Sequence, residues 1–236
     1  MIAICLITFR PNNIWCDFLN LFTEYKIFMI IDDNDFDLSD FINYSNITFI
    51  KIDNDKCKLH NYIDTNFTLN KLISGWDKAL YYFGVEDKTY DFIWFMEDDV
   101  LVYNENTIIQ IDKQYIDEDL LSSSYIENSD GNKNTWYWDR INIQYQPPYY
   151  NGMMCVVRFS KKMLNCINDY ANENNTLFFL EALFPTIAIK NKLNYKTPIE
   201  FDKIYYRHDF TGEQFNINNF YHPLKDLNEH NSFRNY

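Results

Sequence analysis

Three short apolar stretches in the first half of the chain predict buried strands. Residues 2–9 (IAICLITF) and 26–31 (KIFMII) are nearly continuous apolar runs, the pattern of strands that are covered on both faces. Residues 47–52 (ITFIKI) alternate well enough to predict a third strand. Pro11 ends the first run, and Asp32 with Asp33 ends the second.

Helical spacing follows two of these runs. Residues 14–22 read as a helix, and residues 70–83 place large apolar side chains three and four positions apart, with Gly84 as the expected C-cap. The next apolar segment, 91–103 (DFIWFMEDDVLVY), reads as a strand that runs into three consecutive carboxylates. Strands alternating with helices indicate an α/β fold with a mostly parallel central sheet flanked by helices. Ligands of such sheets bind beyond the carboxyl ends of the strands.

The second half of the chain is less regular and shows no linker, so we expect one domain over residues 1–236. Its final part, after about residue 200, is polar and is expected to wrap the surface. The predicted elements are short strands at 122–126 and 153–159, a loop at 128–150, a helix at 161–170, and a helix at 177–189 that Pro185 interrupts or starts.

Composition excludes several classes of protein. With 21 Lys and Arg against 34 Asp and Glu, the net charge is −13, so nucleic acid is not an expected partner. The chain has 5 glycines, and the closest two, Gly75 and Gly84, are nine positions apart. A P-loop or a G-x-G-x-x-G turn is therefore impossible.

The five cysteines form no C-x-x-C pair, which argues for a reducing compartment and against a zinc ribbon. Cys5 and Cys155 lie in apolar runs and are expected to be buried free thiols. The first ten residues lack the basic region of a signal peptide, and no apolar run approaches the ~18 residues of a membrane span. We therefore expect a soluble, cytoplasmic protein with no membrane span.

The three carboxylates Glu97, Asp98 and Asp99 are the sharpest chemical feature. They follow FIWFM directly, and adjacent carboxylates at a buried strand end repel one another unless a cation compensates them. Because side chains alternate along a strand, Glu97 and Asp99 are expected on one side and Asp98 on the other. Such a set can hold a hard divalent ion and also accept hydrogen bonds from ribose hydroxyls. The other interpretation is a solvated acidic turn.

The stretch 75–102 (GWDKALYYFGVEDKTYDFIWFMEDDVLV) resembles the centre of GT-A-fold glycosyltransferases. There a helix packs before a buried strand that ends in a D-x-D-type motif, which binds Mn²⁺ or Mg²⁺ and the sugar nucleotide. Glu97-Asp98-Asp99 matches this motif with Glu in place of the first Asp. The resemblance implies that Asp99 contacts the metal, with Glu97 and Asp98 on ribose or metal-bound water.

The same resemblance extends over about residues 1–103, the expected nucleotide-sugar-binding half, and leaves 104–236 for the acceptor and the C-terminal tail. It implies further cofactor-binding residues at the ends of the first two strands and in the helix before the motif. These are Thr8, Phe9 and Arg10, then Asp32 and Asp33, and Lys78.

Weaker parallels lie in the second half. Glu181, in LFFLEALFP, falls where inverting members of the family place the base that deprotonates the acceptor hydroxyl, and its apolar neighbours should raise its pKa. A solvent-facing helix Glu is the alternative. His222 and His208 compete as the last metal ligand, and Lys225, three positions after His222, is expected on the diphosphate. The aromatic run 136–138 suits either an acceptor site or a packed hydrophobic staple.

These features predict a metal-dependent glycosyltransferase that moves a sugar from a nucleoside-diphosphate donor, with UDP favoured, to a hydroxyl of a glycan, protein or small molecule. A sugar-1-phosphate nucleotidyltransferase is an alternative, but FRPNNIW after the first strand is not the glycine-rich, basic loop that would hold a triphosphate. A non-catalytic sugar- or protein-binding module of the same fold is a second alternative. A metal-dependent phosphatase or nuclease is a third, although no basic groove is evident.

Overall fold

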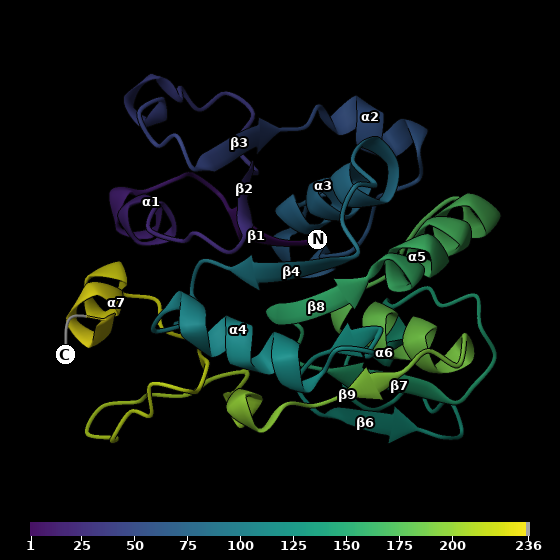
Figure 1. Cartoon of the computed structure of the whole chain (residues 1–236). Coiled ribbons are helices and arrows are strands. Elements are labelled where there is room, and N and C mark those ends of the chain that lie inside the picture. The colour runs from purple at the N-terminus through teal and green to yellow at the C-terminus, as the bar shows by residue number, and fades with distance from the viewer. Residues whose placement is uncertain (235–236) are drawn as a thin grey trace.

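The chain forms a seven-stranded sheet with helices on both faces, as the computed structural model of residues 1–234 shows (Figure 1). The sheet order is β3-β2-β1-β4-β8-β5-β9, and β8 alone runs antiparallel to its neighbours. The predicted mostly parallel α/β fold is therefore confirmed. The strands of the sheet are β1 (Ile2–Thr8), β2 (Lys26–Ile31), β3 (Ile47–Lys51), β4 (Phe92–Glu97), β5 (Leu120–Leu121), β8 (Val156–Ser160) and β9 (Tyr195–Lys196).

Two small sheets and seven α-helices complete the described residues. β6 (Tyr125–Asn128) pairs with β7 (Tyr149–Gly152), and β10 (Lys203–Ile204) pairs with β11 (Tyr221–His222). The helices are α1 (Asn13–Leu19), α2 (Asn54–Leu59), α3 (Gly75–Tyr81), α4 (Glu105–Gln114), α5 (Lys161–Asn174), α6 (Leu180–Lys190) and α7 (Leu227–Arg234). No helix among residues 1–234 is long and apolar enough to cross a membrane.

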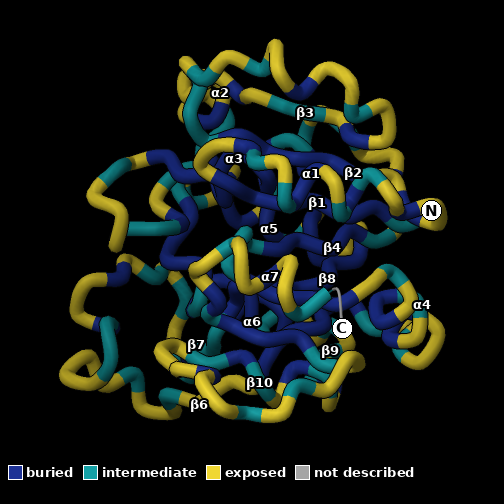
Figure 2. Tube along the Cα trace, turned by 90° about the vertical axis from the view of Figure 1, so that its left-hand side faces the viewer, coloured by how far each residue is buried: buried dark blue, intermediate teal, exposed yellow. Residues whose placement is uncertain are grey.

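Alternation along β1 explains why the sheet is buried on both faces. Ala3, Cys5 and Ile7 point into one apolar cluster, which α3, α5 and α6 cover, whereas Ile4 and Leu6 point into a second cluster under α1 and α4. Figure 2 shows the central strands as the buried layer of the molecule. The strand predictions for this region are confirmed, and the continuous apolar runs match strands that are covered on both sides.

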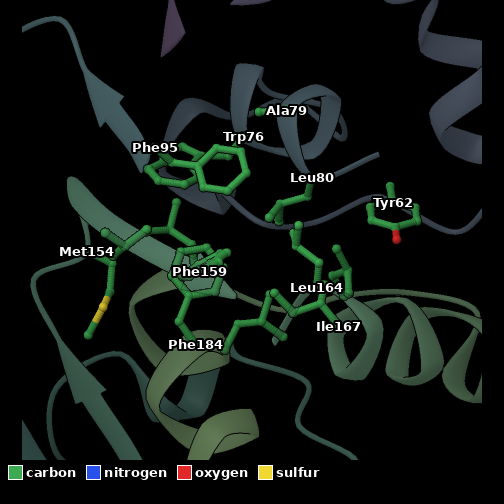
Figure 3. Packing of buried hydrophobic residues seen from close by; sticks show 14 of the residues in the cluster. Tyr62, Trp76, Ala79, Leu80, Phe95, Met154, Phe159, Leu164, Ile167 and Phe184 are labelled. Carbon is green, nitrogen blue, oxygen red and sulfur yellow. The ribbon is translucent and has the colours of Figure 1, made fainter. Parts of the chain in front are cut away.

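The first cluster is built largely from aromatic rings. Trp76 of α3, Phe95 of β4, Phe159 of β8 and Phe184 of α6 lie in one chain of ring contacts, with centroids 4.8–6.0 Å apart (Figure 3). Such pairs stabilise a core beyond the burial of their area. They also fix α3 and α6 on the same face of the strand that carries the three carboxylates.

Several predicted element bounds were wrong for local reasons. The helix expected over 70–83 begins only at Gly75, because Ser74 and Asp77 form a capping box there. Gly84 is not a C-cap. It lies inside a π-helical segment (Tyr82–Glu86), where a Cβ would come within 2.5 Å of the Tyr62 hydroxyl. The strand expected over 91–103 ends at Glu97, and Asp98 and Asp99 lie in a turn.

The second half also departs from its predicted bounds. The strand expected over 122–126 is two separate strands, β5 and β6, and the one expected from 153 begins at Val156. α6 runs through Pro185 instead of stopping there. The segment after residue 200 does not simply wrap the surface, since Tyr221 and His222 are buried. That burial places a histidine at the carboxylates.

A buried charge network under α4 gives a stability prediction. Asp112 accepts hydrogen bonds from Arg158 Nη1 at 2.7 Å, the Tyr25 hydroxyl at 2.6 Å and Trp94 Nε1 at 3.2 Å, all in the interior. Asp112→Ala should lower the free energy of unfolding by about 3–5 kcal/mol, because it leaves a buried guanidinium without its counter-ion. Urea unfolding measures this loss.

The matched control is Asp55→Ala, which removes the carboxylate of an exposed pair with Lys58. Solvent screens that pair, so no resolvable change in the unfolding free energy is expected. Equal losses for the two variants would contradict the stabilising role of the buried network.

Candidate functional site

The three carboxylates stand at the carboxyl end of β4, beside the ends of β1 and β2. The strand ends at Glu97, and Val100 N–H donates to the Glu97 carbonyl at 3.2 Å to close a tight turn. This turn sends the three side chains in two directions. The sequence predicted that Glu97 and Asp99 lie on one side and Asp98 on the other. The structure shows this division, but a turn produces it instead of a continued strand.

Glu97, Asp99 and His222 converge, with potential ligand atoms all within 4.8 Å of one another. His222 reaches the cluster because β11 is tied to the turn after β4. Leu101 and Tyr221 exchange two backbone hydrogen bonds of 2.8 and 3.0 Å, and Leu224 N–H donates to the Asp99 carbonyl at 2.8 Å. A segment 120 residues downstream thus supplies the third side chain of the cluster.

Burial and like charge shape the protonation of this cluster. Burial raises the pKa of Glu97 to about 7, the charge of Asp99 adds to the rise, and the Trp76 indole opposes it by donating to Glu97 Oε1 at 2.6 Å. Burial by itself lowers the pKa of His222, but the carboxylates of Asp99 and Glu97 outweigh it, and the pKa is raised. A cation between these groups would relieve the repulsion between the two carboxylates.

The donor atoms of the cluster fit a divalent ion. Asp99 Oδ1 is buried and accepts no hydrogen bond from any described residue; it lies 3.4 Å from His222 Nε2 without hydrogen-bond geometry. His222 Nδ1 donates to the Tyr205 carbonyl at 2.6 Å, which leaves Nε2 as the free nitrogen of the neutral ring. Two carboxylates and one imidazole suit Mn²⁺ or Mg²⁺. Glu97, Asp99 and His222 would hold the ion.

Asp98 faces away from this cluster and anchors the turn to the first strand and helix. Its carboxylate accepts a hydrogen bond from the Thr8 hydroxyl, and its carbonyl accepts from Trp15 Nε1 at 2.8 Å. Burial raises the pKa of Asp98, and the Thr8 hydrogen bond opposes the rise. Asp98 and Thr8 nevertheless both line a cavity beside the cluster, as the prediction of a ligand contact requires.

That cavity has a volume of about 340 Å³ and runs from Glu97 and Asp99 along the ends of β1 and β2. Phe9, Asp32 and Lys71 form its outer part, and the Phe9 ring is 58% exposed. Lys71 forms an ion pair with Asp32 and lies 5.9 Å from the centroid of the Phe9 ring. The sequence prediction missed Lys71 because it stands in a polar loop with no motif around it.

Of the cofactor-binding residues predicted in the first half of the chain, three lie outside this cavity. Lys78 is buried, with Nζ donating to the Asp32 carbonyl at 2.5 Å and to Asn34 Oδ1 at 3.1 Å, so it supports Asp32 from beneath. Arg10 and Asp33 bind each other at 2.7 Å, and the guanidinium lowers the pKa of Asp33. Neither residue lines the cavity.

A second cavity, of about 280 Å³, adjoins the first and shares Glu97 and Asp99 with it. Glu97, Asp99, His222, Glu181 and Lys225 all line it. Burial raises the pKa of Glu181 to about 7, with a smaller contribution from the charge of Glu97. Glu181, predicted as the base, and Lys225, predicted on the diphosphate, thus line the same cavity.

The structure does not bring His208 to the cluster. Its Nε2 pairs with the Glu213 carboxylate, and it lines a separate surface hollow. Of the two histidines considered as metal ligands, His222 is the one that lies with Glu97 and Asp99 among the described residues.

Glu181 is held in place by a buried chain of hydrogen bonds from α3. Asp77 caps α3 through Ser74 and accepts from Thr65 N–H at 3.1 Å, and the Thr65 carbonyl accepts from Leu180 N–H at 2.9 Å. Leu180 directly precedes Glu181 at the start of α6. The loop before α3 therefore sets the position of α6 relative to Glu97, Asp99 and His222.

Comparison of this sequence and structure with known proteins identifies the class of fold. No family model and no curated protein match the sequence. A structure of the galactosyltransferase LgtC in complex with donor and acceptor sugar analogues matches with a TM-score of 0.55 and 12% identity, over 100% of this chain and 95% of that chain. An active-site mutant of LgtC matches with a TM-score of 0.54, the same identity and the same coverage.

A third solved structure, a 4-diphosphocytidyl-2C-methyl-D-erythritol synthase from Anaerococcus prevotii, matches with a TM-score of 0.48 and 11% identity, over 84% of this chain and 85% of that chain. At these identities the likeness shows the fold alone. The fold is that of GT-A glycosyltransferases, which confirms the resemblance in its structural part.

The geometry of the cluster predicts that Asp99 and His222 each contribute to metal binding. Asp99→Asn and His222→Ala should each weaken Mn²⁺ binding roughly tenfold or more, because each removes one ligand of three. Loss of the free Mn²⁺ signal in electron paramagnetic resonance measures binding directly. His208→Ala is the matched control and should bind Mn²⁺ as the unchanged protein does. Equal binding by Asp99→Asn and His208→Ala would contradict the assignment.

Proposed function

We propose that this protein is a metal-dependent glycosyltransferase, which transfers a sugar from a nucleoside-diphosphate donor, UDP-linked by preference, to a hydroxyl acceptor. The observation that carries the proposal is the cluster of Glu97, Asp99 and His222 between two cavities on a GT-A fold. One cavity offers room for a nucleotide along the strand ends, and the other is bordered by a half-buried carboxyl group.

The donor is assigned to the cavity along β1 and β2. Phe9 offers an exposed ring for a base to stack on, and Asp98 and Asp32 offer carboxylates to ribose or base donors. Lys71 at one end and Lys225 beside the cluster provide positive charge for the diphosphate. A bound divalent ion supplies charge neutralisation to the diphosphate leaving group.

The acceptor hydroxyl is assigned to the Glu181 side. A carboxyl with a pKa near 7 is well matched to removing a proton from a hydroxyl at neutral pH. The hydroxyl would lose its proton to Glu181 as its oxygen bonds to the anomeric carbon, and the bond from that carbon to the diphosphate would break, releasing the nucleoside diphosphate. If the attack comes from the face opposite the diphosphate, the anomeric centre is inverted; a retaining enzyme would not need Glu181 in this role.

Donor binding gives the first test. UDP should raise the melting temperature only when Mn²⁺ is present, because a cation held by Glu97, Asp99 and His222 would supply the positive charge that a diphosphate needs beside these carboxylates. Asp99→Asn should abolish the rise. At a ligand concentration of a hundred times Kd the stabilisation is about 2.7 kcal/mol, which a thermal-shift assay resolves. A panel with GDP, dTDP, CMP and ADP identifies the base. No metal-dependent shift with any nucleotide would overturn the transferase and leave a binding module of the same fold.

Glu181 gives a second test, through pH and stereochemistry. Because the carboxylate is the active form, kcat/KM should rise tenfold per pH unit below about 7 and level off above it; a bound cation shifts this limb slightly downward. Glu181→Gln should lower kcat by about 10²–10⁴-fold and remove the limb, while the UDP–Mn²⁺ thermal shift persists. A product that keeps the donor's anomeric configuration in NMR would show that Glu181 is not this base.

A further inference from the structure

A large cleft adjoins the Glu181 side of the proposed active site. Its volume is about 740 Å³, within the range of about 300–1,000 Å³ typical of ligand pockets. Glu181, Tyr137, Met153 and Tyr206 line both this cleft and the cavity that holds the metal cluster. A molecule in the cleft can therefore reach the cluster past Glu181.

Aromatic side chains form one wall of the cleft. The Trp136 and Tyr137 rings lie 5.5 Å apart, and the hydroxyls of Tyr137 and Tyr206 lie 3.5 Å apart. Trp136 also packs on Phe179, at 5.7 Å between ring centroids, and Phe179 is the N-cap residue of α6, two positions before Glu181. Aromatic faces take the C–H faces of pyranose rings, and tyrosine hydroxyls bind sugar hydroxyls.

The charged side chains that line the cleft are both acidic. Glu181 and Asp202 line it, and among residues 1–234 no Lys or Arg does. Two cations lie nearby without lining the cleft. Arg207 stacks at 5.0 Å on the ring of Tyr206, itself a cleft residue, and lines another hollow, and Lys203 pairs with Glu213 at 3.4 Å. The charges in the lining itself are therefore negative, on a protein whose net charge is −13.

The two cavities at the cluster differ from the cleft. Lys71 lines the cavity along β1 and β2, and Lys225 lines the cavity that Glu97, Asp99 and Glu181 share. Each of these cavities therefore combines carboxylates with a lysine. The lining of the cleft, within residues 1–234, has carboxylates and no lysine or arginine.

We propose that the cleft binds an uncharged pyranoside as acceptor, and that Asp202 and Glu181 together reject sugars that carry a carboxylate or a phosphate. The inference rests on the proposed function for the direction of transfer. Binding of the sugar itself requires only the cleft. Aromatic stacking supplies the attraction, and repulsion between like charges supplies the selectivity.

Matched sugars test the proposal directly. Methyl glycosides of glucose, galactose and mannose are each compared with their 6-carboxylates, the methyl uronides, by saturation-transfer NMR with and without UDP and Mn²⁺. Each pair differs in one charged group, so the comparison isolates charge. We expect at least one neutral glycoside to bind and its uronide to bind at least tenfold more weakly.

Two variants separate the charge effect from the stacking effect. Asp202→Asn should bring the uronide to within about threefold of the neutral glycoside, whereas Asp55→Asn, which removes an exposed carboxylate on α2, should not. Tyr137→Ala should abolish binding of both sugars, whereas Tyr44→Ala, far from the cleft lining, should not. A uronide that binds as well as its neutral partner, or the absence of any glycoside signal, overturns the proposal.

The outcomes distinguish this proposal from the proposed function. Charge-selective sugar binding without any UDP–Mn²⁺ thermal shift would support the cleft and overturn the transferase. A metal-dependent nucleotide shift together with equal binding of neutral and acidic sugars would overturn the cleft proposal and leave the transferase intact.

Discussion

The repulsion between Glu97 and Asp99 is the constraint on which the arrangement of the site depends. Both stand at the end of a strand that is buried on two faces, where charge is costly to hold. The neighbouring groups reduce that cost, since the Trp76 indole donates to Glu97 and the His222 ring lies beside Asp99. Each comes from a different segment of the chain.

The rigidity of the surrounding core gives this cluster its fixed geometry. Trp76 both donates to Glu97 and belongs to the aromatic chain that joins α3 to α6 (Figure 3). Trp76 therefore links the cluster of Glu97, Asp99 and His222 to α6, the helix that carries Glu181. A second link runs through Asp77 and Thr65 to Leu180. Small shifts of α3 would move the carboxylates and Glu181 together.

The sequence predicted the parts of the fold that periodicity determines. The apolar run 26–31 corresponds to a strand residue for residue, because a run this short and rich in Ile suits a strand that is buried on both faces. The position of the acidic motif at the end of β4 followed from the same pattern. Helix ends were less accurate, because the capping box at Ser74 depends on side-chain hydrogen bonds that spacing does not reveal.

Long-range contacts explain what the sequence could not decide. His222 and His208 have similar local contexts, and only the pairing of Leu101 with Tyr221 brings one of them to Asp99. Lys78 lies in the motif region yet is buried under Asp32, whereas Lys71, from an unremarkable loop, lines the cavity. Residue type and spacing thus identified the chemistry of the site, but the three-dimensional pairing of distant segments selected its members.

The distribution of charge connects these observations. Although the protein has a large excess of carboxylates, Lys71 and Lys225 line the cavities around the cluster, and within residues 1–234 no lysine or arginine lines the neighbouring cleft. Under the proposed function, a diphosphate at the cluster would find compensating charge from these two lysines. An anion in the cleft would meet only acidic lining groups. The same excess of negative charge that argues against nucleic acid would therefore favour an uncharged partner in the cleft.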